Sequence, residues 1–355
     1  MALTSRVGGY AQRIFSQTIR VHPPPGLMIN HCLCYFLNMS ISKIAGHDLA
    51  PGRIIKDHIH VDGTEIHVPH VIISGVADGP VLLVTAGIHN AEYVGIQAAI
   101  ELSSEIDPEQ LAGTLIIVPV ANRSGFENRT MSMVHEDGKN LNRVFPGDEN
   151  GTAADRLAHL LFNTFITYAD AYVDLHSGDG FEELMPYVYY VGDTDCEEAA
   201  AAMASCVDTE YYVRSRCKAE GAYNTSSMSG IPSILIERGQ LSQFPREEID
   251  ADKADVINIM KHLDMLDGDH REFSKTRLIE CELHSPASGC WYPELHAGDR
   301  FTKDQLLGTI RNYFGEDIEE VRATEDGIII YQCASLNIVK DGPMISYGIV
   351  SAANQ

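Results

Sequence analysis

His89 and Glu92, spaced H-x-x-E, are the residues whose types and spacing most clearly suggest chemistry in this chain. They follow an apolar run from Val81 to Val84, after which the chain continues through Thr85 and Ala86 to Gly87. A buried strand that stops at a glycine and then delivers an imidazole and a carboxylate could begin a metal site. The pair alone is a weak signal, because similar pairs occur by chance at His176/Asp179, His296/Asp299 and His31/Cys34.

Two further apolar strands end in residues suited to zinc chemistry. The strand at 171–175 leads to His176, and the strand at 233–236 leads to Glu237. Ligand sites in open α/β sheets form outside the carboxyl ends of strands, so these residues can meet His89 and Glu92. Two histidines and one glutamate leave a fourth position for water, as in catalytic zinc sites. Zinc lowers the pKa of such a water, and Glu237 could take its proton and pass it to a leaving group.

A long polar loop over residues 122–151 carries arginines in a chain that is otherwise strongly acidic. It contains Arg129 and the segment NLNRVFPG, which holds Asn142 and Arg143. Arginine side chains match carboxylates bidentately, so the loop predicts a binding site for a substrate carboxylate. For Arg123 we expect only a surface salt bridge.

Period-two alternation over residues 54–75 predicts a β-hairpin with a type I′ turn at Asp62-Gly63. Four histidines lie in this segment, at positions 58, 60, 67 and 70. Because they alternate with strand-forming residues, we expect them on a half-exposed sheet face and not around a metal.

Strands and helices alternate from there to about residue 263. We expect further strands at 81–85, 115–120 and 187–191, and helices at 91–106, at 152–168, from 196 onwards and at 247–263. Glu92 would lie in the first turn of the first helix, and Thr152 with Asp155 forms a capping box for the second. The alternation predicts an α/β fold with a mixed or largely parallel sheet that helices cover on both faces.

After about Phe273 the pattern changes to short strand-like pieces separated by Gly and Pro turns, which predicts a small all-β domain. This region resembles the barrel-sandwich fold of biotinyl and lipoyl carriers. Those carriers present a modifiable lysine at a hairpin tip, but the matching turn here, Asn312–Asp317, has none. A carrier role is therefore rejected, and Trp291 is expected in the core or at an interface of this domain.

Composition excludes some partners. The net charge is −24 and the pI is about 4.9, which disfavours binding to nucleic acid or to anionic membrane surfaces. The 8 cysteines are scattered, which argues against a disulfide framework and favours a reducing, cytoplasmic location. No apolar run reaches the length of a membrane span. An oligomer is possible.

The first 38 residues differ from the rest of the chain. No acidic residue precedes Asp48, and Arg6, Arg13 and Arg20 lie among Ser, Gln and apolar residues, as in an organelle presequence. The alternative, which we favour, is an extension without a fold upstream of a biological start at Met39. We therefore expect an extension at 1–38, a catalytic domain at 39–273 and a small β domain at 274–355.

Four motifs carry a family resemblance. His89-x-x-Glu92, NLNRVFPG, VDLHSG and ILIERG, in that order, resemble the succinylglutamate desuccinylase/aspartoacylase family, which is itself similar to the zinc carboxypeptidases. The resemblance implies a zinc-carboxypeptidase-like mixed sheet flanked by helices. It also implies one zinc ion per chain, held by His89, Glu92 and His176.

The resemblance further assigns roles to four residues. It implies that Glu237 is the general base and acid, that Asn142 and Arg143 grip a substrate carboxylate, and that Arg129 polarises the scissile carbonyl.

The chain departs from the family pattern at two places. Asn90-Ala91 stands where relatives often have Gly-Gly or Gly-Asp, which could narrow the pocket. Asn140 stands where relatives often have an Asp that orients a zinc-bound histidine, so here the supporting group is uncharged. The sequence leaves open whether Glu182 and Glu183 shape the pocket mouth or lie in a solvated turn. It also leaves open whether Asp174 supports the site.

These observations predict a zinc-dependent hydrolase that cleaves the amide bond of a small anionic N-acyl amino acid or related carboxylate. The alternative within enzymes is a metallocarboxypeptidase acting on short peptides, which would use the same chemistry. A non-catalytic binding protein with the same fold is a third hypothesis, against which the intact ligand set and Glu237 argue.

Overall fold

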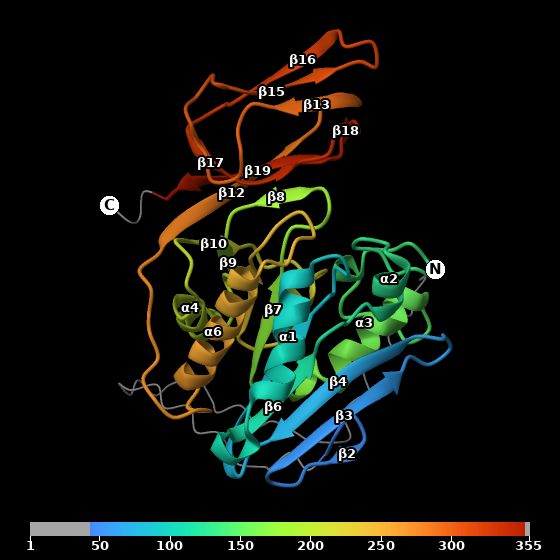
Figure 1. Cartoon of the computed structure of the whole chain (residues 1–355), viewed down its shortest axis with the longest axis vertical. Helices are drawn as coiled ribbons and strands as arrows, with labels where there is room; N and C mark the ends of the chain where they lie inside the picture. The colour runs from blue at the N-terminus through green and yellow to red at the C-terminus, as the bar shows by residue number, and fades with distance from the viewer. Residues whose placement is uncertain (1–42, 352–355) are drawn as a thin grey trace, which may run out of the picture. The chain divides into compact units, whose positions relative to one another are not determined.

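The computed structural model describes residues 43–351, which are built around one large mixed β-sheet (Figure 1). The predictions for residues 1–38, His31/Cys34 and Met39 fall outside the described residues. Twelve strands follow one another across the large sheet: β14 (Arg300–Phe301), β17 (Gly327–Cys333), β19 (Pro343–Val350), β12 (Thr276–His284), β10 (Tyr211–Ser215), β9 (Tyr187–Val191), β11 (Ser233–Glu237), β7 (Ala171–His176), β5 (Ala77–Ala86), β6 (Ala112–Val118), β4 (His67–Ser74) and β3 (Arg53–His60). A thirteenth, β8 (Glu182–Leu184), pairs with β17.

The centre of the sheet is parallel, because β6, β5, β7 and β11 pair in the same direction. All six residues of β7 are buried, as expected for a strand covered on both faces. Helices α1 (Tyr93–Glu105), α4 (Glu197–Ser205) and α6 (Arg246–His262) share one core cluster, and α3 (Ala153–Thr164) and α5 (Ala222–Met228) share the opposite one. Each fully buried aliphatic side chain contributes about 1.5–3 kcal/mol to stability. The predicted α/β fold with a sheet covered on both faces is confirmed.

The predicted hairpin is present, but its turn is longer than predicted. β3 and β4 pair antiparallel from Arg53↔Ser74 to His60↔His67, and the six residues 61–66 connect them. The Val61 N–H donates to the Ile66 carbonyl at 2.9 Å, which closes this wider loop. A two-residue type I′ turn was therefore the wrong interpretation of Asp62-Gly63. Of the four histidines, three are exposed and only His70 is buried.

Local signals located most other elements. The predicted capping box is present at the start of α3. The Asp155 carboxylate accepts hydrogen bonds from the Thr152 N–H at 2.9 Å and from the Thr152 hydroxyl at 2.8 Å. The 122–151 segment is not a continuous loop, since it contains α2 (Arg123–Asn128) and the 3₁₀ turn η2 (Leu141–Arg143). The sequence patterns also missed β10, α5 and several short elements: β1 (Lys43–Ile44), β2 (His47–Asp48), β8 and η1 (Pro108–Gln110). The helix predicted at 152–168 divides into α3 and the 3₁₀ turn η3 (Ile166–Tyr168).

The C-terminal region is all-β, as predicted. A second, antiparallel sheet contains β16 (Asp317–Arg322), β15 (Leu306–Arg311), β13 (Gly289–Pro293) and β18 (Asn337–Ile338). Trp291 is buried in a core shared with residues of β17 and β19. Because β12 pairs in parallel with β10, the large sheet continues across residue 273, and the domain boundary placed there stays a prediction.

Arg123, the cysteines and the helices can each be compared with the sequence analysis. Arg123 forms the expected surface ion pair, with its Nε 2.8 Å from Glu127 Oε1. The six cysteines within residues 43–351 are all free thiols. None of the helices in this part of the chain combines the length and apolarity needed to cross a bilayer.

Glu280 links the C-terminal strands to the centre of the sheet. Its Oε1 accepts hydrogen bonds from the Tyr189 and Ser346 hydroxyls, each at 2.7 Å. Burial raises the pKa of Glu280 above its ordinary value of 4.5, although these two hydrogen bonds oppose the shift. The folded state therefore holds this proton more tightly than the unfolded state, so its contribution to stability is fullest below pH 4.5 and is lost as the pH rises.

We expect Glu280→Gln to become more stable relative to the wild type as the pH rises above 4.5. Glutamine keeps an acceptor oxygen but does not ionise, and each unit of pKa difference corresponds to about 1.4 kcal/mol. Denaturant unfolding at a series of pH values measures the difference in free energy. Glu282→Gln, an exposed position on the same strand, is the matched control and should show no such trend. A pH-independent difference for Glu280→Gln would contradict this account.

Candidate metal centre

Three neighbouring parallel strands carry the predicted metal-site residues to one edge of the sheet. β7 lies between β5 and β11, with Leu175 opposite Ala86 and His176 opposite Glu237. After β5 the chain turns sharply at Gly87, whose φ is +67°. A Cβ there would lie 3.0 Å from the Ile96 side chain, so this turn requires glycine. Parallel strand ends thus place the segment that contains His89 beside His176.

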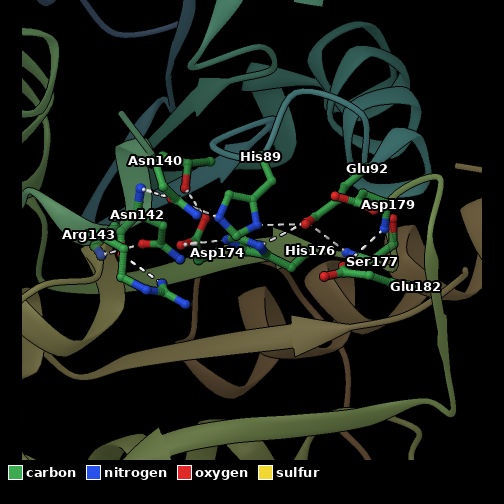
Figure 2. Close-up of polar contacts among 12 residues, drawn as sticks. His89, Glu92, Asn140, Asn142, Arg143, Asp174, His176, Ser177, Asp179 and Glu182 are labelled. Atoms are coloured by element: carbon green, nitrogen blue, oxygen red, sulfur yellow. Dashed lines mark hydrogen bonds and ion pairs between the residues drawn. The ribbon is translucent and has the colours of Figure 1, made fainter. Parts of the chain in front are cut away.

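Glu92 occupies the N-cap position of α1, just before the helix and not within its first turn as predicted. From there its carboxylate reaches both histidines (Figure 2). Oε1 lies 2.7 Å from His89 Nδ1, and Oε2 lies 2.8 Å from His176 Nδ1. The candidate ligand atoms of the three residues all lie within 4.8 Å of one another. The structure therefore brings His89, Glu92 and His176 together, as the sequence predicted.

The remaining nitrogen of each imidazole faces a supporting oxygen. His89 Nε2 lies 3.1 Å from Asn140 Oδ1, and His176 Nε2 lies 3.2 Å from Asp174 Oδ2, although the latter pair is not aligned as a hydrogen bond. The Thr85 hydroxyl donates to the other oxygen of Asp174 at 2.7 Å. This arrangement, with Nδ1 towards the centre and Nε2 towards a polar oxygen, is typical of metal-binding histidines. Asp174 is thus buried beside the His176 imidazole, and its supporting role stays a prediction.

Charge within the cluster fits a cation. Burial alone would raise the pKa of Glu92, but His176 and His89 outweigh it and lower the pKa to about 2. Burial likewise opposes a charge on His176, yet Glu92 and Asp174 raise its pKa well above the ordinary value. The Ser177 N–H also donates to Glu92 Oε2 at 3.0 Å. A buried carboxylate held ionised between two imidazoles matches the nitrogen and oxygen ligands that zinc prefers.

Glu237 ends β11 directly beside His176 in the sheet. Its Oε2 is buried and has no hydrogen-bond partner among residues 43–351. Burial, reinforced by Glu92, raises the pKa of Glu237 well above the ordinary value. An unsatisfied carboxyl oxygen with a raised pKa beside a cation site is suited to accept and release a proton.

The substrate-binding residues predicted from the loop lie at η2. Asn140 joins them to the cluster, because its Oδ1 accepts from the Asn142 N–H at 2.8 Å and also faces His89. Asn142 is buried, and its Oδ1 accepts from the Ala222 N–H at 2.9 Å. Arg143 is exposed, with Nη1 donating to the Asn142 carbonyl at 2.9 Å. Asn142 and Arg143 therefore lie next to the candidate metal centre.

Arg129 is not brought into the cluster. It ends α2 in the left-handed conformation with φ 58°, and its side chain is exposed. Among residues 43–351 no hydrogen bond or ion pair joins this side chain to His89, Glu92 or His176.

Several side chains near the site received no firm role from the sequence. Glu182 is largely buried rather than in a solvated turn, and burial together with Asp179 and Glu92 raises its pKa to about 8. Tyr187 lies opposite Glu237 on the neighbouring strand, and its hydroxyl is 3.2 Å from that of Tyr189. The period-two spacing of these tyrosines in YVYYV was the signal that could have placed them on one face.

A family model describes the same region as the succinylglutamate desuccinylase/aspartoacylase catalytic domain, and it matches residues 78–263 of this chain. The chain belongs to this family. The resemblance drawn from the four ordered motifs is therefore confirmed. As a member of the succinylglutamate desuccinylase/aspartoacylase family, it shares the region that contains His89, Glu92, His176 and Glu237 with the family's catalytic domain.

Three named proteins are also similar to this chain. The N-alpha-acetyl-L-2,4-diaminobutyric acid deacetylase of Halomonas elongata is 26% identical over 269 residues, which cover 71% of this chain and 77% of that protein. The product-bound ectoine utilization protein EutE (DoeB) of Ruegeria pomeroyi has a TM-score of 0.77 at 24% identity, covering 85% of this chain and 98% of that one. A succinylglutamate desuccinylase from a Silicibacter species has a TM-score of 0.76 at 24% identity, covering 85% and 97%. The two structural similarities establish a common fold.

Proposed function

We propose that this protein is a zinc-dependent deacylase that hydrolyses the amide bond of a small anionic N-acyl amino acid. The observation that carries the proposal is the convergence of His89, Glu92 and His176, with both Nδ1 atoms on the Glu92 carboxylate. Membership of a family that includes deacylating hydrolases supports the reaction type. The six free cysteines of the described residues are compatible with the cytoplasmic location that we also propose.

His89, Glu92 and His176 would hold one zinc ion per chain. When bound, zinc supplies Lewis acidity to the attacking water and to the scissile carbonyl. Asn140 and Asp174 would keep the two imidazoles oriented through their Nε2 atoms. Because Asn140 is neutral, it orients His89 without adding a negative charge.

Glu237 would move the proton. Its unsatisfied Oε2 accepts a proton from the attacking water and donates it to the departing amine nitrogen. Its raised pKa suits this cycle, because a carboxyl that holds a proton more tightly can retain it until the amine leaves.

Asn142 and Arg143 would bind the substrate carboxylate, and Arg129 would polarise the scissile carbonyl oxygen. The Asn142 oxygen already accepts from Ala222, which leaves its amide nitrogen to donate. The exposed Arg143 guanidinium supplies a bidentate donor in a protein whose net charge of −24 would otherwise repel an anion. The role of Arg129 in polarising the carbonyl rests on the family resemblance alone.

Turnover of N-acetyl amino acids and of C-terminal dipeptides, measured side by side with the zinc-loaded protein, tests the proposal. We expect the N-acetyl amino acids to be hydrolysed with the higher kcat/KM. In the same assay Arg143→Ala should raise KM about 10–100-fold, since a charged hydrogen bond is worth about 1.5–3 kcal/mol. Arg129→Ala should instead lower kcat, and Arg123→Ala, the surface control, should change neither. Faster turnover of dipeptides would make the carboxypeptidase alternative correct.

A further inference from the structure

A second cluster of metal-ligand side chains lies apart from the candidate metal centre. It consists of Cys206 at the end of α4, His262 at the end of α6, and His270 in the segment that leads from α6 to β12. Figure 1 labels the two helices and the strand that carry and flank this cluster. The candidate ligand atoms of these three residues lie within 4.8 Å of one another. It shares no residue with the first cluster, and the proposed hydrolysis does not use it.

The two separations at His270 Nε2 match those between ligands of one tetrahedral ion. His262 Nδ1 lies 3.5 Å from His270 Nε2, and the two rings are nearly perpendicular at 81°. Glu272 supplies a fourth group, with its Oε1 3.7 Å from the same His270 Nε2. Ligand atoms that share a tetrahedral zinc at about 2.0–2.3 Å lie roughly 3.3–3.8 Å apart.

The negative charge of Glu272 also acts on the other two members of the cluster. Burial raises the pKa of the Cys206 thiol to about 11, and the charge of Glu272 adds to this effect. Burial and His270 lower the pKa of His262, and Glu272 partly offsets that shift. The Glu272 carboxylate thus acts on Cys206 and His262 through its charge, and it lies beside His270.

The backbone around the cluster is already fixed. The Asn258 side-chain amide donates to the Cys206 carbonyl at 2.6 Å and to the Arg271 carbonyl at 2.8 Å, and its oxygen accepts from the Arg271 N–H at 2.8 Å. The Phe273 N–H donates to the Ser205 carbonyl at 2.8 Å. These bonds hold the segment carrying His270 and Glu272 against α4 and α6, so an ion would meet a largely organised set of ligands.

We propose that Cys206, His262, His270 and Glu272 bind a second, structural zinc ion. One thiolate, two imidazoles and one carboxylate form a ligand set that suits zinc, and four protein ligands leave no open position for a substrate. The ion would fasten the segment between α6 and β12 onto the helical layer. Binding displaces the thiol proton of Cys206.

Cobalt substitution tests this site directly, because Co²⁺ bound to a thiolate gives a charge-transfer absorption in the near ultraviolet. The His89–Glu92–His176 site has no sulfur and cannot produce that band. We expect the metal-stripped full-length protein to take up two Co²⁺ ions per chain and to show the thiolate band. Cys206→Ser should lose the band and retain one ion, whereas Cys217→Ser, which alters an exposed cysteine, should keep both.

His270→Ala provides a second variant if Cys206→Ser does not fold, because the residue is exposed and outside any helix or strand. It should bind one Co²⁺ instead of two and should show a smaller zinc-dependent rise in Tm than the wild type, because only the His89–Glu92–His176 site still binds zinc, while deacylase activity in excess zinc persists. The exposed-sheet variant His58→Ala should behave as wild type. One Co²⁺ per chain with no thiolate band, or a thiolate band that survives both Cys206→Ser and His270→Ala, would overturn the proposal. A thiolate band with a single bound Co²⁺ would instead support the site at Cys206 and contradict metal binding at the His89–Glu92–His176 site.

Discussion

Glu237→Gln is expected to lower kcat about 10²–10⁴-fold while the zinc content and the fold stay unchanged. The amide has the shape of the carboxyl group but cannot take a proton from water or return one to the amine. Because Glu237 is not among the three clustered ligands, its replacement should leave the metal in place. Steady-state kinetics on an N-acetyl amino acid, with metal analysis of the same sample, measures both quantities.

Glu198→Gln is the matched control, since it makes the same chemical change at an exposed position on α4. Its kcat should equal that of the wild type. If Glu237→Gln kept full activity in zinc-loaded protein, the proton would be carried by another group. The buried Glu182, whose pKa is raised to about 8, would then be the first alternative to test.

His89→Ala is expected to remove zinc from the catalytic site and to reduce activity about 10³-fold or more. Loss of the ion removes Lewis-acid stabilisation of several kcal/mol, and about 1.4 kcal/mol corresponds to a tenfold change in rate. The His89 side chain is partly accessible, so its removal should disturb folding less than removal of the buried His176. Metal stoichiometry and kcat/KM of the purified variant provide the measurement.

His58→Ala, an exposed histidine of β3, controls for the loss of an imidazole. A chelator should reproduce the effect of His89→Ala on the wild type, and added zinc should restore activity to the chelated wild type only. The zinc proposal fails if the wild type binds no transition metal and the chelator changes nothing.

Asn90-Ala91, which lies between the candidate metal ligands His89 and Glu92, anchors the turn that carries His89. Asn90 is buried, and its side-chain nitrogen donates to Thr130 Oγ1 at 3.3 Å and to the Met133 carbonyl at 3.2 Å. The Ala91 N–H donates to the Met131 carbonyl at 3.2 Å. These bonds attach the turn to the chain just after Arg129. The identity of residues 90 and 91 therefore bears on how the arginine loop is held next to the site.

Much of the fold and the site could be predicted from sequence because both depend on local patterns. Apolar runs identified β5, β7 and β11, and the polar residues after them identified His89, His176 and Glu237. Parallel neighbours end at the same edge of a sheet, so naming the strands was enough to predict that these residues meet. The capping box at Thr152 and the all-β C-terminal region followed from equally local signals.

Contacts between distant segments could not be predicted in this way. The hydrogen bond that Asn140 Oδ1 accepts from His89 Nε2 and the grouping of Cys206 with His262 and His270 join segments that no periodicity links. The burial of Glu182 likewise depends on segments distant in the sequence. They depend on how loops and helix ends pack onto the sheet, and that packing is set by the shape of the whole core. The sequence by itself determined which residues end the central strands and what chemistry they could perform. Only the tertiary structure decided which oxygen faces each imidazole nitrogen, because hydrogen-bond partners across a fold are fixed by distance and direction.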